Sequence, residues 1–258
     1  MHRPTLATVQ VLALTAICTV PGMQLKATTA IVLRSQHRIV LAADSRAVYR
    51  ANANATECKL FEFHDVYATV SGLAHYGASY RSIDAIREGF AGAGDFQSHV
   101  LTTASFLKHR AENLLAGLQV NNPSEYRYLT RQTSDTSDLV QLAVAQTVNG
   151  QPMLGVIQLQ RNRGTNVLTA RTTVCPGSCR GDARIFYLGY WERIKPYVTD
   201  SGQQRSVGSA ASLDRLIRLE INAHPDEVGA PINIIELNGS GAHWLQNGGN
   251  CSLPGVGW

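Results

Sequence analysis

The chain has 258 residues, of which 44% are hydrophobic and 16% are charged, and its net charge is +4 at neutral pH. This balance is typical of a globular protein and excludes a largely disordered chain. The charge is too small to argue for nucleic acid or an anionic membrane as a partner, so we expect no nucleic-acid partner.

The first 27 residues predict a secretory signal or propeptide. Arg3 gives a positive start, an apolar stretch runs from Leu6 to Val20, and a short polar segment ends at the small residue Ala27. The stretch is too short to span a bilayer comfortably. The alternatives are a wrongly chosen start codon or a short buried helix. We therefore divide the chain into a leader, 1–27, and one domain, 28–258, and expect a periplasmic or secreted protein.

After the leader, short apolar strands are expected at Ala30–Leu33 and Ile39–Ala43, followed by a hairpin of Leu60–Phe63 and Val66–Ser71. Apolar residues then recur at helical spacing from Tyr76 to Phe90.

A second stripe at helical spacing, from Val100 to Leu118, is the clearest helix signal, and a polar loop is expected at residues 120–137. The strands Leu139–Val148 and Met153–Gln160 flank Asn149-Gly150, which predicts a hairpin. The remaining elements are a strand at Arg184–Leu188, a helix from about Ser209 to Ala223, and a hairpin of Ile232–Leu237 with Ala242–Leu245. Strands at both ends around central helices predict an α+β domain of two sheets with helices on their outer faces.

Four cysteines lie beyond the leader, at positions 58, 175, 179 and 251. An even number in an exported chain favours two disulfides. Cys175 and Cys179 could close a small loop and leave Cys58 to pair with Cys251, but the sequence does not fix the connectivity. A four-cysteine zinc site is the alternative. The histidines show no metal-ligand spacing, so we expect neither a metal nor a cofactor.

Thr28 is the candidate nucleophile. A threonine hydroxyl needs a base to take its proton, and an N-terminal threonine carries one in its own α-amine, with an ordinary pKa of about 8. This requires cleavage of the bond after Ala27. Removal of the signal would then also activate the enzyme, because it frees the Thr28 α-amine. The alternative is that a Thr-Thr pair in a strand reflects β propensity alone.

Three further segments could serve such a nucleophile. Asp44 ends an apolar strand in the segment Leu41-Ala42-Ala43-Asp44-Ser45-Arg46. It could hold Lys59 as a charged partner, which would favour the alkoxide and move protons. Gly72 lies where a strand ends, and a backbone N–H there could stabilise an oxyanion. Taken singly, each residue has a simpler explanation. Asp44 and Arg46 could form a surface ion pair, Lys59 could be a solvated lysine, and Gly72 could be a plain helix entry.

In combination, the segment from Thr28 to Gly77 resembles the start of proteasome β-type subunits. An N-terminal threonine, a hydrophobic-Ala-Asp-Ser-Arg motif sixteen positions later, a lysine and a glycine turn follow in the same order. The ending Gly241-Ala242-His243-Trp244-Leu245 is also similar to the last hairpin of that family. The resemblance implies an Ntn-hydrolase four-layer αββα sandwich of two antiparallel sheets. It also implies the site roles of Thr28 as nucleophile, of Asp44, Lys59 and Arg46 as its support, and of Gly72 as oxyanion donor.

The chain departs from that family at the residue before the nucleophile and at two turns that support the N-terminal amine in the family. Ala27 replaces the glycine before the nucleophile, Tyr190 follows Leu188-Gly189 where a Ser-Gly turn is expected, and Val228 replaces a serine. Asp226 could take over with a one-residue shift.

The sequence therefore predicts an exported, N-terminal-threonine amide hydrolase that acts on a peptide. The alternatives are an amidase acting on a small amide, or a catalytically silent, disulfide-braced binding or structural protein. A homo-oligomer is compatible with this interpretation. No ATPase partner is expected, because ATP is scarce outside the cytoplasm.

Overall fold

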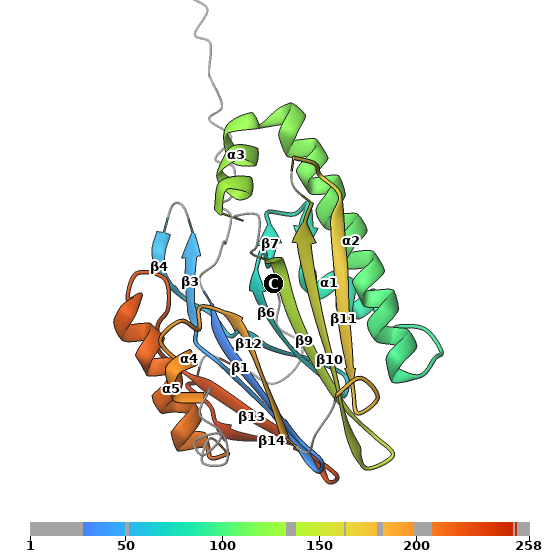
Figure 1. The fold of residues 1–258 in the computed structure, drawn as a ribbon, viewed down its shortest axis with the longest axis vertical. Coiled ribbons are helices and arrows are strands. Elements are labelled where there is room, and N and C mark those ends of the chain that lie inside the picture. The colour runs from blue at the N-terminus through green and yellow to red at the C-terminus, as the bar shows by residue number, and fades with distance from the viewer. Residues whose placement is uncertain are drawn as a thin grey trace, which may run out of the picture.

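The protein is described here by a computed structural model, which covers residues 28–49, 52–132, 138–162, 164–179, 183–198, 208–249 and 251. Two five-stranded antiparallel sheets form its centre (Figure 1). The first sheet contains, in spatial order, β12 (Ala183–Gly189), β1 (Thr29–Ser35), β2 (Arg38–Ala43), β13 (Asn233–Asn238) and β14 (Gly241–Gln246). The second contains β11 (Leu168–Cys175), β10 (Gln151–Arg161), β9 (Asp138–Val148), β6 (Val66–Gly72) and β5 (Leu60–Phe63).

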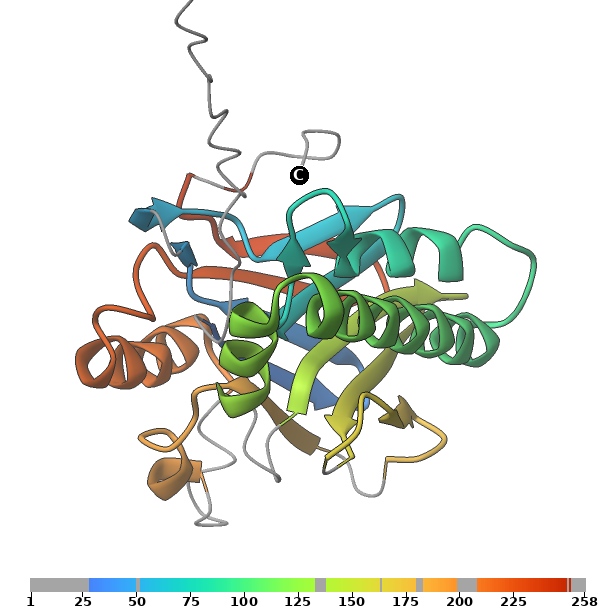
Figure 2. The ribbon, with the colours of Figure 1, turned by 90° about the horizontal axis from the view of Figure 1, so that it is seen from above.

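Helices cover the outer face of each sheet (Figure 2). The second sheet carries α1 (Ser82–Gly89), α2 (Phe96–Asn121) and α3 (Pro123–Gln132), and the first carries α4 (Lys195–Val198) and α5 (Ala210–Ala223). Two short ribbons complete the described elements: β3 (Arg46–Tyr49) with β4 (Asn52–Thr56), and β7 (His75–Tyr76) with β8 (Tyr80–Arg81). The predicted α+β, four-layer αββα architecture is confirmed.

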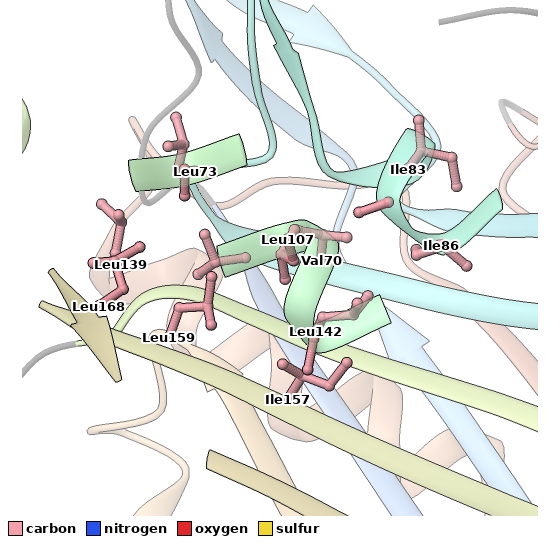
Figure 3. Packing of buried hydrophobic residues seen from close by; sticks show 14 of the residues in the cluster. Val70, Leu73, Ile83, Ile86, Leu107, Leu139, Leu142, Ile157, Leu159 and Leu168 are labelled. Atoms are coloured by element: carbon pink, nitrogen blue, oxygen red, sulfur yellow. The ribbon is translucent and has the colours of Figure 1, made fainter. Parts of the chain in front are cut away.

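Three hydrophobic clusters fill the spaces between the two helix layers and the two sheets. One lies between the sheets, one between the first sheet and α4 and α5, and the largest between the second sheet and α1–α3. Figure 3 shows part of the largest cluster, where Val70 and Leu142 of the sheet approach Leu107 of α2. The apolar stripe from Val100 to Leu118 forms this contact. The predicted helix therefore packs against the sheet through its apolar face.

β1 is a central strand whose two faces both pack against hydrophobic clusters. Ala30 and Val32 pack between the sheets, whereas Ile31 and Leu33 face α5 and its neighbours. A strand buried on both faces must be almost continuously apolar, as this one is. The alternation also decides which way the residues before Ala30 point.

Two sequence predictions are wrong: one places the start of a helix too early, and the other expects a loop where the structure has a helix. The helix expected from Tyr76 begins only at Ser82, because Gly77, with φ of +51°, turns the chain into the β7–β8 ribbon. The loop expected at 120–137 contains α3. The missed signal was Asn122 before Pro123: the Asn122 side chain accepts a hydrogen bond from the Glu125 N–H, and proline suits the first helical position. The strands β3, β4 and β11 were not predicted.

The two predicted disulfides are present. Cys58 is bonded to Cys251 across 193 positions, and Cys175 to Cys179 across 4. These bonds use the four cysteines that the alternative zinc site would have required. Stable disulfides are characteristic of an oxidising compartment. Among the described helices, none has the length and apolar character needed to cross a membrane.

Candidate functional site

Thr28 precedes β1, between the ends of β12 and β2. It is 5% exposed, and its carbonyl oxygen accepts a hydrogen bond from the Tyr190 N–H at 3.0 Å. By the alternation along the strand, Thr28 shares the face of Ala30, which packs between the sheets, whereas Thr29 shares the opposite face with Ile31. The two threonines are therefore not equivalent, and only Thr28 faces the inter-sheet space.

Asp44 follows the end of β2 and is fully buried. Its Oδ1 accepts hydrogen bonds from the Thr29 N–H and from Lys59 Nζ, each at 2.9 Å. Its Oδ2 accepts from the N–H groups of Arg46 and Gly229, each at 3.0 Å, and from Lys59 Nζ at 3.1 Å. One carboxylate oxygen thus joins the lysine amine to the backbone at the start of β1.

Burial dominates the electrostatics of this pair. It raises the pKa of Asp44, whereas the Lys59 charge and the backbone donors at Thr29 and Gly229 lower it. Burial also lowers the pKa of Lys59, which is 4% exposed, although the neighbouring carboxylates of Asp44 and Glu57 act in the opposite direction. A lysine whose pKa is lowered this way gives up a proton more readily than a solvated one.

Gly72 ends β6 with φ of +83°. A Cβ there would lie 2.4 Å from the Leu139 carbonyl oxygen, so the position requires glycine. The Leu73 N–H donates to that oxygen at 2.9 Å. Because hydrogen-bonded and non-bonded pairs alternate along antiparallel strands, the Gly72 N–H is directed away from β9. The Gly72 N–H therefore lies outside the β6–β9 hydrogen-bond ladder, as an oxyanion donor must.

Arg46 contacts Asp44 through its backbone N–H, as described above. Its side chain lies against Gly229, where an added Cβ would be 2.5 Å from the guanidinium Nε. Ser45, between the two residues, donates its N–H to the Gly229 carbonyl oxygen at 2.9 Å. The Asp-Ser-Arg segment is therefore fastened to the Gly229 turn by backbone contacts rather than by the charge of the arginine.

Several residues at this site were not assigned a role from the sequence. Gly229 is one of them, and its backbone N–H donates to Asp44 Oδ2. Glu57 lies two residues before Lys59, and burial raises its pKa to about 7, against the lowering effect of the Lys59 charge. Each of the two charges acts on the pKa of the other, so Glu57 belongs to the same electrostatic cluster as Lys59.

Among the described residues, the family departures are those at Tyr190 and Val228. The Tyr190 hydroxyl donates to the Glu227 carboxylate, and its ring stacks on His224 at 4.4 Å. Asp226 is exposed, and Val228 is buried. Glu227, rather than Asp226, thus connects the turn after α5 to the segment beside Thr28.

A small cavity lies next to Gly72, on the helix side of β6. It is lined by Phe61, Val70, Ala74, His75, Arg81, Ser82 and Ile83. Burial lowers the pKa of His75, and the nearby Arg81 charge acts in the same direction, so His75 is biased towards its neutral form.

Residues 1–27, including the cleavage point after Ala27, lie outside the described residues. Among the described residues, Glu192, Glu220 and His224 form a separate group of side chains that could ligate a metal.

Comparison with known proteins gives structural matches only. No family model and no curated protein matches the chain. The solved structures to which it is similar include the Anbu (Gly-1) mutant from Hyphomicrobium sp. strain MC1, with 14% identity, a TM-score of 0.49, and coverage of 82% of this chain and 81% of that one. Another is Anbu (ancestral beta-subunit) from Yersinia bercovieri, with 12% identity, a TM-score of 0.48, and coverage of 84% and 87%.

These matches correct the family named from the sequence. Anbu proteins are proteasome-like but distinct from proteasome β-type subunits, and neither a family model nor a curated relative places the chain among those subunits. The identification of the chain as a proteasome β-type subunit is wrong. The roles of Thr28, Asp44, Lys59, Arg46 and Gly72 therefore have to be argued from the residues and their geometry.

Proposed function

We propose that the protein is an exported amide hydrolase that uses Thr28 as an N-terminal nucleophile and acts on peptides. The observation that carries the proposal is the shared Asp44 oxygen, which binds both Lys59 Nζ and the Thr29 N–H at 2.9 Å. A buried amine is thereby fixed next to the backbone of the proposed nucleophile.

The chemistry follows from groups already described. The Thr28 Oγ attacks the substrate carbonyl carbon and passes its proton to the free α-amine, assisted by Lys59. The Gly72 N–H stabilises the resulting oxyanion. Breaking the C–N bond releases the amine product, which takes up the proton, and leaves an ester on Thr28. Water then hydrolyses the ester and regenerates the hydroxyl.

The substrate class is supported by the cavity beside Gly72. Its lining combines the apolar side chains of Phe61, Val70 and Ile83 with the polar His75 and Arg81. A pocket beside an oxyanion donor is suited to receive one side chain of an extended peptide. Export is supported by the two disulfides and by the leader-like composition of residues 1–27.

The first test is the N-terminus of the purified native protein, determined by intact-mass measurement. A chain that starts at Thr28 supports the enzyme. A native, exported chain in which Thr28 remains internal contradicts it and favours the silent binding protein.

The second test compares Thr28→Ala with Thr29→Ala in the hydrolysis of a fluorogenic peptide library. Thr29 is a matched control because its buried Oγ1 has no hydrogen-bond partner within the described part of the chain. We expect Thr28→Ala to retain less than about 0.1% of activity and Thr29→Ala to stay near wild type. Equal turnover by both variants would remove Thr28 as the nucleophile. Inert peptides together with Thr28-dependent cleavage of small amides would identify the amidase instead.

A further inference from the structure

A second group of chemically active side chains lies where the end of α5 meets the segment after β12. Ligand atoms of Glu192, Glu220 and His224 all lie within 4.8 Å of one another. Glu220 and His224 are four residues apart, so they project from the same side of the last helical turn. Glu192 approaches from the other segment. The group is thus made by tertiary structure, and its spacing in the sequence follows no metal-binding motif.

Glu220 supplies an independent sign that a ligand belongs here. Its side chain is completely buried, and its Oε1 accepts hydrogen bonds from the N–H groups of Arg193 at 2.6 Å and Ile194 at 3.1 Å. Its Oε2 is also buried, but within the described residues it has no hydrogen-bond partner. A carboxylate oxygen that is buried without a hydrogen bond has lost its hydration at a cost in free energy. A cation bound to the oxygen would offset that cost.

The open oxygen is directed into the group. Glu220 Oε2 lies 3.7 Å from His224 Nε2, which is longer than a hydrogen bond. The His224 ring is fixed by stacking on Tyr190 at an interplanar angle of 21°. Glu192 is exposed, and its Oε2 accepts from the Trp191 N–H at 3.1 Å, so the group has one side that solvent and a metal ion can reach.

We propose that Glu192, Glu220 and His224 bind one divalent transition-metal ion, with Zn²⁺ as the preferred ion. Two carboxylates and one imidazole are a donor set that zinc accepts, with water completing the coordination. The imidazole disfavours Mg²⁺ and Ca²⁺, which require oxygen ligands. Rotation of the exposed Glu192 side chain can close the site.

The position of the site gives the ion a structural role. One ligand segment includes Tyr190, whose N–H holds the Thr28 carbonyl oxygen. The other continues into the turn after α5, where the Val228 N–H bonds to the His224 carbonyl oxygen at 2.8 Å and the next N–H, that of Gly229, holds Asp44. A bound ion would thus connect the segment that holds the Thr28 carbonyl oxygen to the turn that holds the Asp44 carboxylate. The metal site itself does not depend on the chemistry proposed for Thr28.

The alternative is a bare ion pair between Glu220 and a protonated His224. Calorimetric titration of the untagged, metal-stripped full chain with Zn²⁺ alone, followed by thermal unfolding with and without the ion, separates the two. We expect one ion per chain, a higher unfolding temperature, and no comparable effect of Mg²⁺. No zinc binding, or equal binding of Mg²⁺, would overturn the proposal.

Three variants test the ligands. His224→Phe keeps the ring against Tyr190 but removes both nitrogens, and Glu192→Gln changes an exposed side chain with little risk to folding. Each should weaken zinc binding by more than about tenfold, as should Glu220→Gln. His243→Phe is the matched control, because His243 also lies beside a glutamate, Glu236, at 3.3 Å, and it should bind zinc as wild type does. Zinc binding that survives both Glu192→Gln and His224→Phe would show that the ion binds elsewhere.

Discussion

Asp44 and Lys59 form an ion pair from which solvent is almost excluded, with side-chain exposures of 0% and 4%. The pair itself contributes little net stability, because desolvating two charges offsets most of their attraction. Removing one partner is different, since the other then stays buried without its counter-charge. The three backbone N–H donors to Asp44 soften that cost but do not neutralise the carboxylate.

We therefore predict that Lys59→Met lowers the free energy of unfolding by about 3 kcal/mol or more. Lys108→Met is the matched control, because Lys108 forms a partly exposed i,i+4 pair with Glu112 at 2.7 Å, and it should cost less than about 0.5 kcal/mol. Urea unfolding of the two variants measures the difference. Equal costs would mean that the Asp44–Lys59 pair is effectively solvated.

Glu57 should make stability depend on pH. Burial raises its pKa from 4.5 to about 7 in the folded state, so between these values the folded chain holds a proton that the unfolded chain has lost. Stability from this group is present at low pH and is lost as the pH rises to about 7. The unfolding free energy of wild type, measured relative to Glu57→Gln, should therefore fall across this window and level off above it. Parallel curves for the two proteins, from urea unfolding at pH 5 to 8, would contradict the assignment.

At the scale of elements, the end of β12 closes tightly on the start of β1. Gly189 has φ of +77°, and a Cβ there would lie 1.8 Å from the Thr28 carbonyl oxygen and 2.6 Å from Ser71 Oγ. The Gly189 N–H donates to the Gln141 side chain at 2.7 Å. A strand of each sheet and the proposed nucleophile thus meet at one glycine, which leaves no room for a side chain.

Gly189→Ala should cost at least about 2 kcal/mol more in unfolding free energy than Gly164→Ala. Gly164 has a similar φ of +70° but no atom within 4 Å of an added Cβ, so it isolates the backbone preference, worth about 1 kcal/mol. The difference between the variants reports the clash with Thr28. Denaturant unfolding measures both, and similar losses would show that β12 can move away from β1 at little cost.

At the scale of the whole molecule, the Cys58–Cys251 disulfide fastens the C-terminal end of the described chain beside Lys59. It spans 193 positions, whereas the Cys175–Cys179 disulfide spans 4. Because a crosslink stabilises mainly by restricting the unfolded chain, the longer loop should contribute more.

The double variant Cys58→Ser/Cys251→Ser should lose about 5 kcal/mol of unfolding free energy, and Cys175→Ser/Cys179→Ser about 2 kcal/mol. Thermal and denaturant unfolding of both variants, without reductant, gives the ranking. The opposite order would mean that native-state contacts of the short loop outweigh the entropy of the long one.

Much of the fold could be predicted from local patterns. The hairpin at Asn149-Gly150, the stripe from Val100 to Leu118 and the apolar run that became β2 each carry their signal within a few residues. α3 was missed because its capping signal at Asn122-Pro123 lies in a strongly polar stretch. β3 and β4 were missed because their sequences have little apolar alternation.

The sequence by itself determined the layered αββα class, the order of its main elements and the residue types of the candidate site, because periodicity and chemical type are local properties of the chain. Only the tertiary structure decided which oxygen of Asp44 meets Lys59, that Gly229 rather than the Arg46 charge braces this carboxylate, and that Glu192 approaches Glu220 and His224. Those contacts join segments up to 185 positions apart, and their geometry follows from how the two sheets pack, which no short stretch of sequence encodes.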